Sequence, residues 1–347
     1  LIQIPLPAYS GTDPGYSPGV IAAPYINIGT VRNRGVDLHL NSKNITGNGT
    51  DFNWSTDFTL SHNKNKVMKL NTDGASLPGK FGNDIVSQTV VGGSIGDFYG
   101  YKVDGIFATA SDFETHALPT DTDGNVLPVR PTSGGVWYGD LKFKDLNGDG
   151  VITEKDRTYL GSPIPDFQLG LGNNFSYKGF DLNIFFSANV GNEVINGMRI
   201  NGENPLTNYG YLKALEDHAV LALVNPEGSA TDYKNVYVTN PNTTIIGLRN
   251  NDSNRNNRFS DKYVEDGSFI RCKSMTLGYT MPNEWMQKMH INSLRMYVNV
   301  TNPFLITKYK GMDPEVGSWN PLAAGIDNGF YPQARTITLG INVGLTK

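Results

Sequence analysis

A strict two-residue alternation over residues 166–190 constrains this chain more than any other feature of its sequence. Large apolar residues occupy every second position from Phe167 to Tyr177 except Asn173, and the pattern resumes after the two-residue turn Lys178-Gly179. The apolar set is Phe167, Leu169, Leu171, Phe175, Tyr177, Phe180, Leu182, Ile184, Phe186, Ala188 and Val190. Because successive side chains of a strand point to opposite faces, the segment is predicted to be a β-hairpin with one apolar face.

Apart from Asp181 and Phe185, the opposite face of this hairpin carries small uncharged side chains, and it has no Lys or Glu. Its members include Gln168, Gly170, Gly172, Asn174, Ser176, Asn183, Ser187 and Asn189. Each strand holds about ten residues, which is the length of a strand that crosses a bilayer. The pattern is typical of a transmembrane β-strand that has lipid on one side and water on the other.

The overall composition agrees with a barrel wall made of transmembrane β-strands and argues against several other classes of protein. Charged residues make up 18% of the chain, below the roughly 25% of ordinary soluble domains. The mean hydropathy of -0.34 and the absence of an 18-residue apolar run in the sequence argue against membrane-spanning helices. A net charge of -4 gives no basic field, so nucleic acid is not expected as a partner.

Further alternating segments flank the hairpin on both sides. They cover residues 36–41, 52–61, 274–281, 294–301 and 336–345. A soluble β-sandwich that binds glycans, or an adhesin, would show the same period, but with charged outer faces. The scarcity of Lys and Glu in these segments favours transmembrane strands over a soluble sandwich. We expect seven to eight such strands in this chain.

The lengths of the connectors support an antiparallel up-and-down arrangement. Short connectors are expected at 45–50, 178–179 and 282–291, and long ones at 7–30, 68–164, 192–265 and 303–333. Short and long connectors alternate, as they do between the periplasmic and outer ends of a barrel. The one helix that the pattern predicts, over 208–224, falls inside a long outer loop.

Residues 145–156 match the template of a calcium-binding loop. Oxygen ligands are expected from Asp145, Asn147, Asp149, the carbonyl of Val151, and Asp156, with Gly150 at the sharp turn. A hard cation needs such a ring of oxygens, and we expect Ca²⁺ in a structural role. The alternative is an Asp/Asn/Gly turn that never binds metal.

Two other patterns receive structural interpretations. Gly92-Gly-Ser94-Ile-Gly96 satisfies the serine-hydrolase pattern, but a strand-like segment follows Ser94 where a nucleophile elbow needs a helix. We therefore expect a glycine-rich loop, no catalytic residue and no enzyme. Aromatic residues near the predicted strand ends suit a membrane-interface girdle, and core packing explains them nearly as well; they are Trp54, Tyr177, Phe180, Tyr279 and Trp285.

Several motifs resemble those of the SusC-like (SusC/RagA) TonB-dependent transporters. Residues 266–280 (DGSFIRCKSMTLGYT) are similar to a strand of that family, and residues 302–315 (NPFLITKYKGMDPE) to its near-C-terminal signature. Segments 32–38, 61–67 and 139–150 resemble further family segments in the same order along the chain.

The resemblance implies an all-β fold, the C-terminal part of an antiparallel barrel of about 22 strands with a plugged lumen. Residues 1–347 would then belong to one barrel domain, with the plug and the N-terminal strands outside this chain. The resemblance also implies import of oligosaccharides or peptides across the outer membrane, driven by TonB, with a SusD-like lipoprotein as partner. Outer-membrane lipid would surround the wall. The sequence itself does not identify any residue that contacts substrate.

Overall fold

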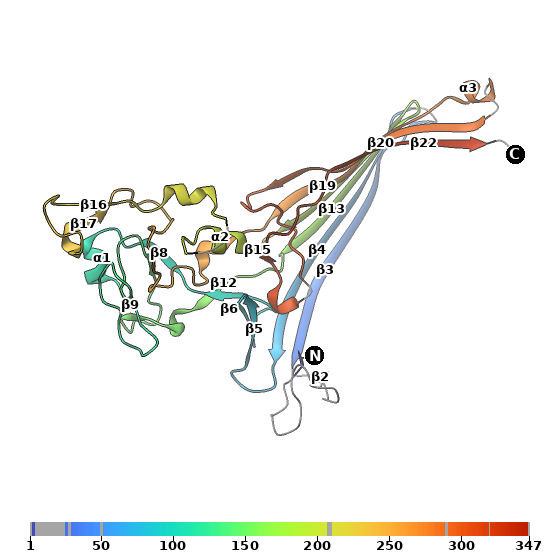
Figure 1. Cartoon of the computed structure of the whole chain (residues 1–347). Helices are drawn as coiled ribbons and strands as arrows, with labels where there is room; N and C mark the ends of the chain where they lie inside the picture. The colour runs from blue at the N-terminus through green and yellow to red at the C-terminus, as the bar shows by residue number, and fades with distance from the viewer. Residues whose placement is uncertain are drawn as a thin grey trace, which may run out of the picture.

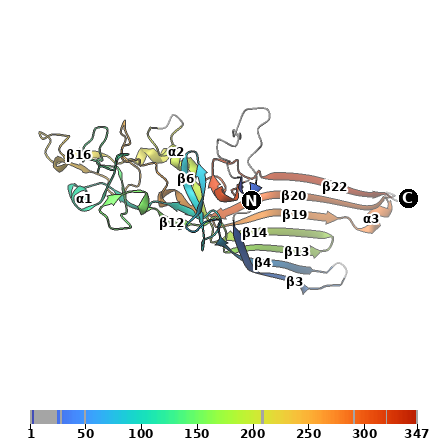
Figure 2. The ribbon, with the colours of Figure 1, turned by 90° about the horizontal axis from the view of Figure 1, so that it is seen from below.

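The chain forms one curved antiparallel sheet with a lobe of long loops at one end (Figure 1). The computed structural model describes residues 2–3, 25–26, 29–48, 51–206, 210–288, 291–318 and 320–345. The seven sheet strands are β3 (Thr30–Ile45), β4 (Asn53–Lys69), β13 (Phe167–Tyr177), β14 (Phe180–Val190), β19 (Phe269–Thr280), β20 (Ile291–Thr307) and β22 (Thr336–Leu345). Their order in the sheet follows their order in the chain (Figure 2), as an up-and-down barrel wall requires.

The register of the sheet separates an apolar face from a polar one. One row of paired residues across six strands is Leu38, Leu60, Leu169, Ala188, Ile270 and Ile306. The adjacent row, on the opposite face, begins Asp37, Ser61, Gln168 and Asn189. We call the face with Leu38 the outer face and the face with Asp37 the inner face.

The outer face has no protein layer over it in the described part of the chain. Val36 is 70% exposed, Leu339 78% and Ile341 67%. A β-sandwich would bury these side chains against a second sheet. The sandwich alternative is therefore wrong, and the outer face is the surface that meets lipid.

The connectors follow the expected alternation. The turn at Lys178 (φ 47°) and Gly179 (φ 87°) has two positive φ angles, which is the two-residue type I′ geometry that matches strand twist. Residues 46–52 and 281–290 join the other strand pairs at this end, and the second of these contains α3 (Asn283–Lys288). The long connectors are 70–166, 191–268 and 308–335. Most of the expected connector 7–30 lies outside the described residues.

Several strands extend further than the alternation indicated. Strand β4 runs to Lys69 and β20 to Thr307, beyond the expected limits of 61 and 301. Above these limits polar and charged residues occupy both faces of β4, as in Asn63 and Lys64. The period-two signal disappears there, although the backbone pairing continues.

Bulges in two strands also change which residues face outward. The pairing of β19 shifts between Cys272 and Ser274, so that Lys273 is an extra residue relative to β14. Strand β20 compensates at Asn302, whose φ is 51°. Asn tolerates this left-handed conformation better than most residues do.

The loops pack around two hydrophobic clusters. The distal cluster includes Phe107, Trp137, Tyr138, Leu141 and Phe143. The second cluster lies near the sheet and includes Val86, Phe98, Ile195, Phe259 and Ile326, drawn from all three long loops.

Short elements give the loop lobe its framework. They are β5 (Ser76–Phe81), β6 (Asp84–Val90), β7 (Phe98–Gly100), β8 (Val103–Ile106), α1 (Ala110–Thr115), β9 (Leu118–Pro119), β10 (Leu141–Phe143), β11 (Val151–Ile152), β12 (Thr158–Gly161), β15 (Glu193–Asn196), α2 (Gly197–Gly202), β16 (Leu221–Leu223), β17 (Val236–Val238), β18 (Val264–Asp266) and β21 (Ile326–Asp327). None of the helices in the described residues is long and apolar enough to cross a membrane.

The helix expected over 208–224 is wrong. Lys213–Asp217 forms a short 3-10 helix, and Leu221–Leu223 is strand β16, which pairs with β17. Ala219 is 3% exposed in the distal cluster. Packing against distant segments thus overrides the local helical pattern. Residues 208–209 of the expected helix lie outside the described residues.

Candidate functional site at the outer rim of the sheet

The long loops meet at the rim where β13, β14 and β19 begin or end. Strand β15, from the second loop, pairs with β18 and in parallel with β21, from the third loop. This three-stranded sheet ties the two loops together directly above the wall. The loops at the rim are therefore folded together into one structure and are not independent of each other.

The two family-like motifs contact each other through ion pairs at this rim. Arg271 Nη2 lies 2.5 Å from Asp313 Oδ1, and Lys273 Nζ lies 2.7 Å from Glu315 Oε1. Arg271 pairs with Ser187 in the sheet and is on the inner face. The contacts hold the 308–335 loop against the inner face of β19.

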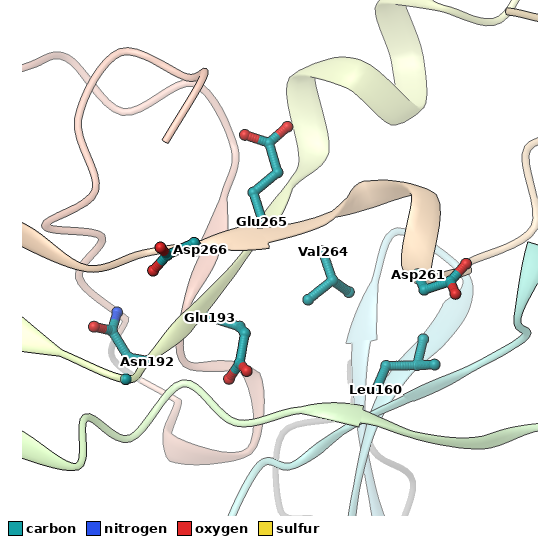
Figure 3. A pocket seen from close by; sticks show the side chains of 8 residues that line it. Leu160, Asn192, Glu193, Asp261, Val264, Glu265 and Asp266 are labelled. Atoms are coloured by element: carbon teal, nitrogen blue, oxygen red, sulfur yellow. The ribbon is translucent and has the colours of Figure 1, made fainter. Parts of the chain in front are cut away.

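A pocket of about 330 Å³ opens at the rim, where β15 pairs with β18 (Figure 3). Its lining carries four carboxylates and neither Lys nor Arg; the residues are Leu160, Gly191, Asn192, Glu193, Asp261, Val264, Glu265 and Asp266. Figure 3 shows Glu265 on the opposite side of β18 from Val264, and Glu265 Oε1 accepts from Arg199 Nη1 at 2.8 Å. The other carboxylates give the pocket its negative charge.

The environment shifts the acidities of these carboxylates in opposite directions. Burial raises the pKa of Glu193, the NH of Ser162 opposes this, and the charge of Asp266 adds to it. Burial also raises the pKa of Asp261. Hydrogen bonds from the hydroxyl and NH of Ser268 lower the pKa of Asp266. Such a site suits a cationic or hydrogen-bond-donating group of a ligand.

The structure gathers only some of the predicted calcium ligands. The Asp145 carboxylate accepts the NH groups of Gly148 and Gly150, and Asn147 Nδ2 donates to Asp149 Oδ2. Asp156 is fully buried, and its carboxylate accepts from Leu146 N at 3.0 Å and Thr153 N at 2.7 Å.

Asp156 therefore caps a 3-10 turn (Glu154–Asp156) instead of facing the other acids. Among the described residues, no group of three or more His, Cys, Asp or Glu side chains is placed to hold a metal ion. Ca²⁺ at Asp145, Asn147, Asp149, Val151 and Asp156 stays a prediction.

Ser94 has the loop environment that the sequence predicted. Its hydroxyl donates to the carbonyl of Asn65 at 3.0 Å, and its NH donates to Asp97 at 2.7 Å. Strand β7 follows at Phe98, where a nucleophile elbow would begin a helix. Ser94 therefore anchors the loop to β4.

The predicted girdle aromatics lie together at the end with the short turns. Tyr177 and Phe180 flank the type I′ turn, and the Phe180 and Tyr279 ring centroids are 4.5 Å apart. Trp285 is 56% exposed on α3. Trp54 Nε1 donates to Asn173 Oδ1 at 3.0 Å. These positions mark one membrane interface.

Sequence reasoning missed the rim pocket. Glu193 is far from Asp261 and Asp266 in the chain, and an acidic residue in a loop normally indicates only a solvated surface. The Arg271–Asp313 pair was more accessible to prediction, since both residues lie in motifs that already stood out.

The known proteins that this chain resembles in sequence are named as TonB-dependent receptors. No protein-family model matches the chain. TonB-dependent receptor P3 of Formosa agariphila is 34% identical over 360 residues, covering 99% of this chain and 31% of that protein. TonB-dependent receptor SusC of Bacteroides thetaiotaomicron is 29% identical over 321 residues, covering 91% of this chain and 27% of the receptor.

A solved structure of the RagAB peptide transporter aligns with a TM-score of 0.68 at 21% identity, covering 99% of this chain and 31% of that chain. The chain is a SusC-like portion of a TonB-dependent receptor. It spans about a third of the length of the relatives it matches. The SusC-like fold is an antiparallel outer-membrane barrel wall, and the described residues form seven of its strands, which do not close into a barrel. The matched relatives are named as receptors and transporters, not as enzymes.

Proposed function

We propose that this SusC-like chain forms the wall and outer vestibule of a TonB-dependent importer in the outer membrane. The observation that carries the proposal is the seven-strand meander, whose outer face is apolar and exposed and whose inner face is polar beneath folded loops. Work would come from TonB acting through parts of the protein beyond this chain. No catalytic step is assigned to the chain.

We further propose that the loop lobe meets a SusD-like lipoprotein and that the substrate is an oligosaccharide or a peptide. The rim pocket supports the peptide class, because its carboxylates attract a cationic group that peptides carry and neutral oligosaccharides lack. The RagAB relative is named a peptide transporter, and the name of SusC gives no substrate class.

The test is uptake by cells that carry the full-length receptor or an in-frame deletion of it. The deletion is expected to abolish accumulation of a labelled short basic peptide, and dissipating the proton gradient is expected to do the same. Equal uptake in the deletion strain would overturn the importer proposal. Uptake of a neutral oligosaccharide alone would overturn the peptide assignment.

Calcium is a separate proposal, as a weakly bound structural ion of the 145–156 loop. Support comes from the spacing of Asp145, Asn147 and Asp149 and from the positive φ of Gly150 (84°), which wraps the loop. Asp156 would join only by giving up its bonds to Leu146 and Thr153. The expected affinity is therefore in the millimolar range of extracellular modules.

A further inference from the structure

Four basic side chains form a square on the outer face, at the loop end of β3 and β4. Arg32 is paired with Lys66, and Arg34 with Lys64, in two rows of the same face that the Asn33–Asn65 row of the opposite face separates. Like charges directly opposite each other destabilise an antiparallel pair. No ion pair among the described residues includes any of the four. We call these residues the basic square.

The alternating register places the basic square outside the barrel. Asn33 and Asn65, the residues between the basic pairs, hydrogen bond to each other at 2.7 Å on the opposite face. There Asn65 Oδ1 also accepts the NH of Ile95 from the loop that packs on the inner side of β4. Along β3, the two arginines of the basic square lie on the same face as Val36 and Leu38. That face is exposed and meets lipid.

The height of the basic square coincides with the outer edge of the hydrocarbon layer. Trp54 lies at the opposite end of β4, beside the short turns. At about 3.3 Å per residue and a tilt of about 40°, the segment from Trp54 to Lys64 rises roughly 25 Å. That is about the height of the apolar band of such barrels. Lys64 and Lys66 thus reach the level of the lipid headgroups.

We propose that the basic square binds the phosphate groups of an anionic glycolipid in the outer leaflet. Guanidinium and ammonium groups bind phosphate through charge-assisted hydrogen bonds, and Arg does so in a bidentate way. A phosphate between the strands would replace the repulsion of the two like-charged pairs with attraction. The proposal rests on the outer-membrane location of the chain and is independent of transport.

The experiment measures binding of phosphorylated lipid A to the detergent-purified full-length receptor by native mass spectrometry. The variant carries Arg32→Gln, Arg34→Gln, Lys64→Gln and Lys66→Gln. A matched control removes four exposed loop lysines instead, at Lys80, Lys102, Lys155 and Lys213. Phosphate-free lipid A provides a second probe. Heat-modifiable gel migration verifies that each barrel is folded.

We expect at least a tenfold weaker affinity for phosphorylated lipid A in the square variant and no change in the control. Phosphate-free lipid A should bind the wild type and the square variant equally. The double variant Arg34→Gln/Lys64→Gln should give an intermediate loss. Equal affinity of all variants would overturn the proposal. It would also be overturned if the square variant lost a co-purifying acidic protein, or thermal stability alone, while lipid binding stayed intact.

Discussion

The Arg271–Asp313 ion pair is the most consequential single contact at the rim. The two side chains are 4% and 7% exposed, so neither charge has water as an alternative partner. Removing one member of a buried pair costs about 3–5 kcal/mol when the other charge is left uncompensated. Arg271 keeps a second ion pair, from its Nε to Glu315 Oε2 at 2.6 Å, so the cost of losing Asp313 lies below that range. The Asp313 contact is therefore one of three ion pairs that hold the third loop on the wall.

Asp313→Asn should release the 308–335 loop while leaving the barrel folded. Limited proteolysis of the full-length receptor is expected to cut this loop at least tenfold faster. Asp181→Asn provides the control, because the Asp181–Arg295 pair is 28–29% exposed and a partly exposed pair is worth about 1 kcal/mol or less. Equal cleavage rates in the two variants would contradict the role given to Asp313.

The same pair predicts how the loop responds to acid. Burial alone would raise the pKa of Asp313, but the NH groups of Gln333 and Glu315 and the Arg271 charge lower it. A lowered pKa stabilises the fold at neutral pH, and that contribution is lost as the pH falls through the folded value, below about 4. Loop protection from an acid protease should fall between pH 4 and pH 2 in the wild type. It should fall less in Asp313→Asn.

Calcium should protect the 145–156 loop if it binds there. Millimolar Ca²⁺ is expected to slow cleavage of this loop several-fold, and Asp149→Asn should abolish the effect. Asp121→Asn is the control, because the Asp121 carboxylate also accepts backbone NH groups, from Asp123 and Asn125, in a turn without the calcium spacing. Cleavage that is indifferent to calcium and chelator would refute the prediction.

At the scale of the element, the bulge at Asn302 keeps β20 in register with the displaced β19. Its φ of 51° is tolerated by Asn or Gly and is an outlier for a β-branched residue. Asn302→Val should destabilise the barrel by about 1–3 kcal/mol and lower the temperature of heat-modifiable migration. Asn302→Gly should behave like the wild type. A normal migration temperature for the valine variant would contradict this account.

The hairpin of β13 and β14 was predictable almost to the residue, because the alternation between Phe167 and Val190 departs from the pattern within the strands only at Asn173 and Phe185. The loop end of β4 could not be predicted in this way, because polar residues such as Asn63 and Lys64 occupy both faces of the strand there. The loop interior was also beyond prediction. Val86, Phe98 and Ile195 meet in one cluster, but they come from separate segments with no period to reveal them.

The rim pocket illustrates the same limit for function. Glu193 and Asp266 come together because β15 pairs with β18. No local sequence pattern predicts a pairing between such short strands. The calcium template showed the opposite problem. Its spacing was clear, yet the structure uses Asp156 as a cap.

At the scale of the whole molecule, the three long loops are joined to one another above the wall through the cluster around Phe98. Phe98 is fully buried, and Phe→Ala substitutions in a core cost about 3–5 kcal/mol. Phe98→Ala should make the loops protease-sensitive without altering heat-modifiable migration of the barrel. Simultaneous loss of both properties would show that wall and lobe unfold as one unit.

The two edge strands of the sheet, β3 and β22, determine whether this chain can be stable in a bilayer without further strands. In the described residues β3 is paired only with β4, and β22 only with β20. Their remaining amide and carbonyl groups would face hydrocarbon unsatisfied, at several kcal/mol for each group. These seven strands can therefore persist in a bilayer only when further strands seal both sides, and a preparation of them alone should associate edge to edge.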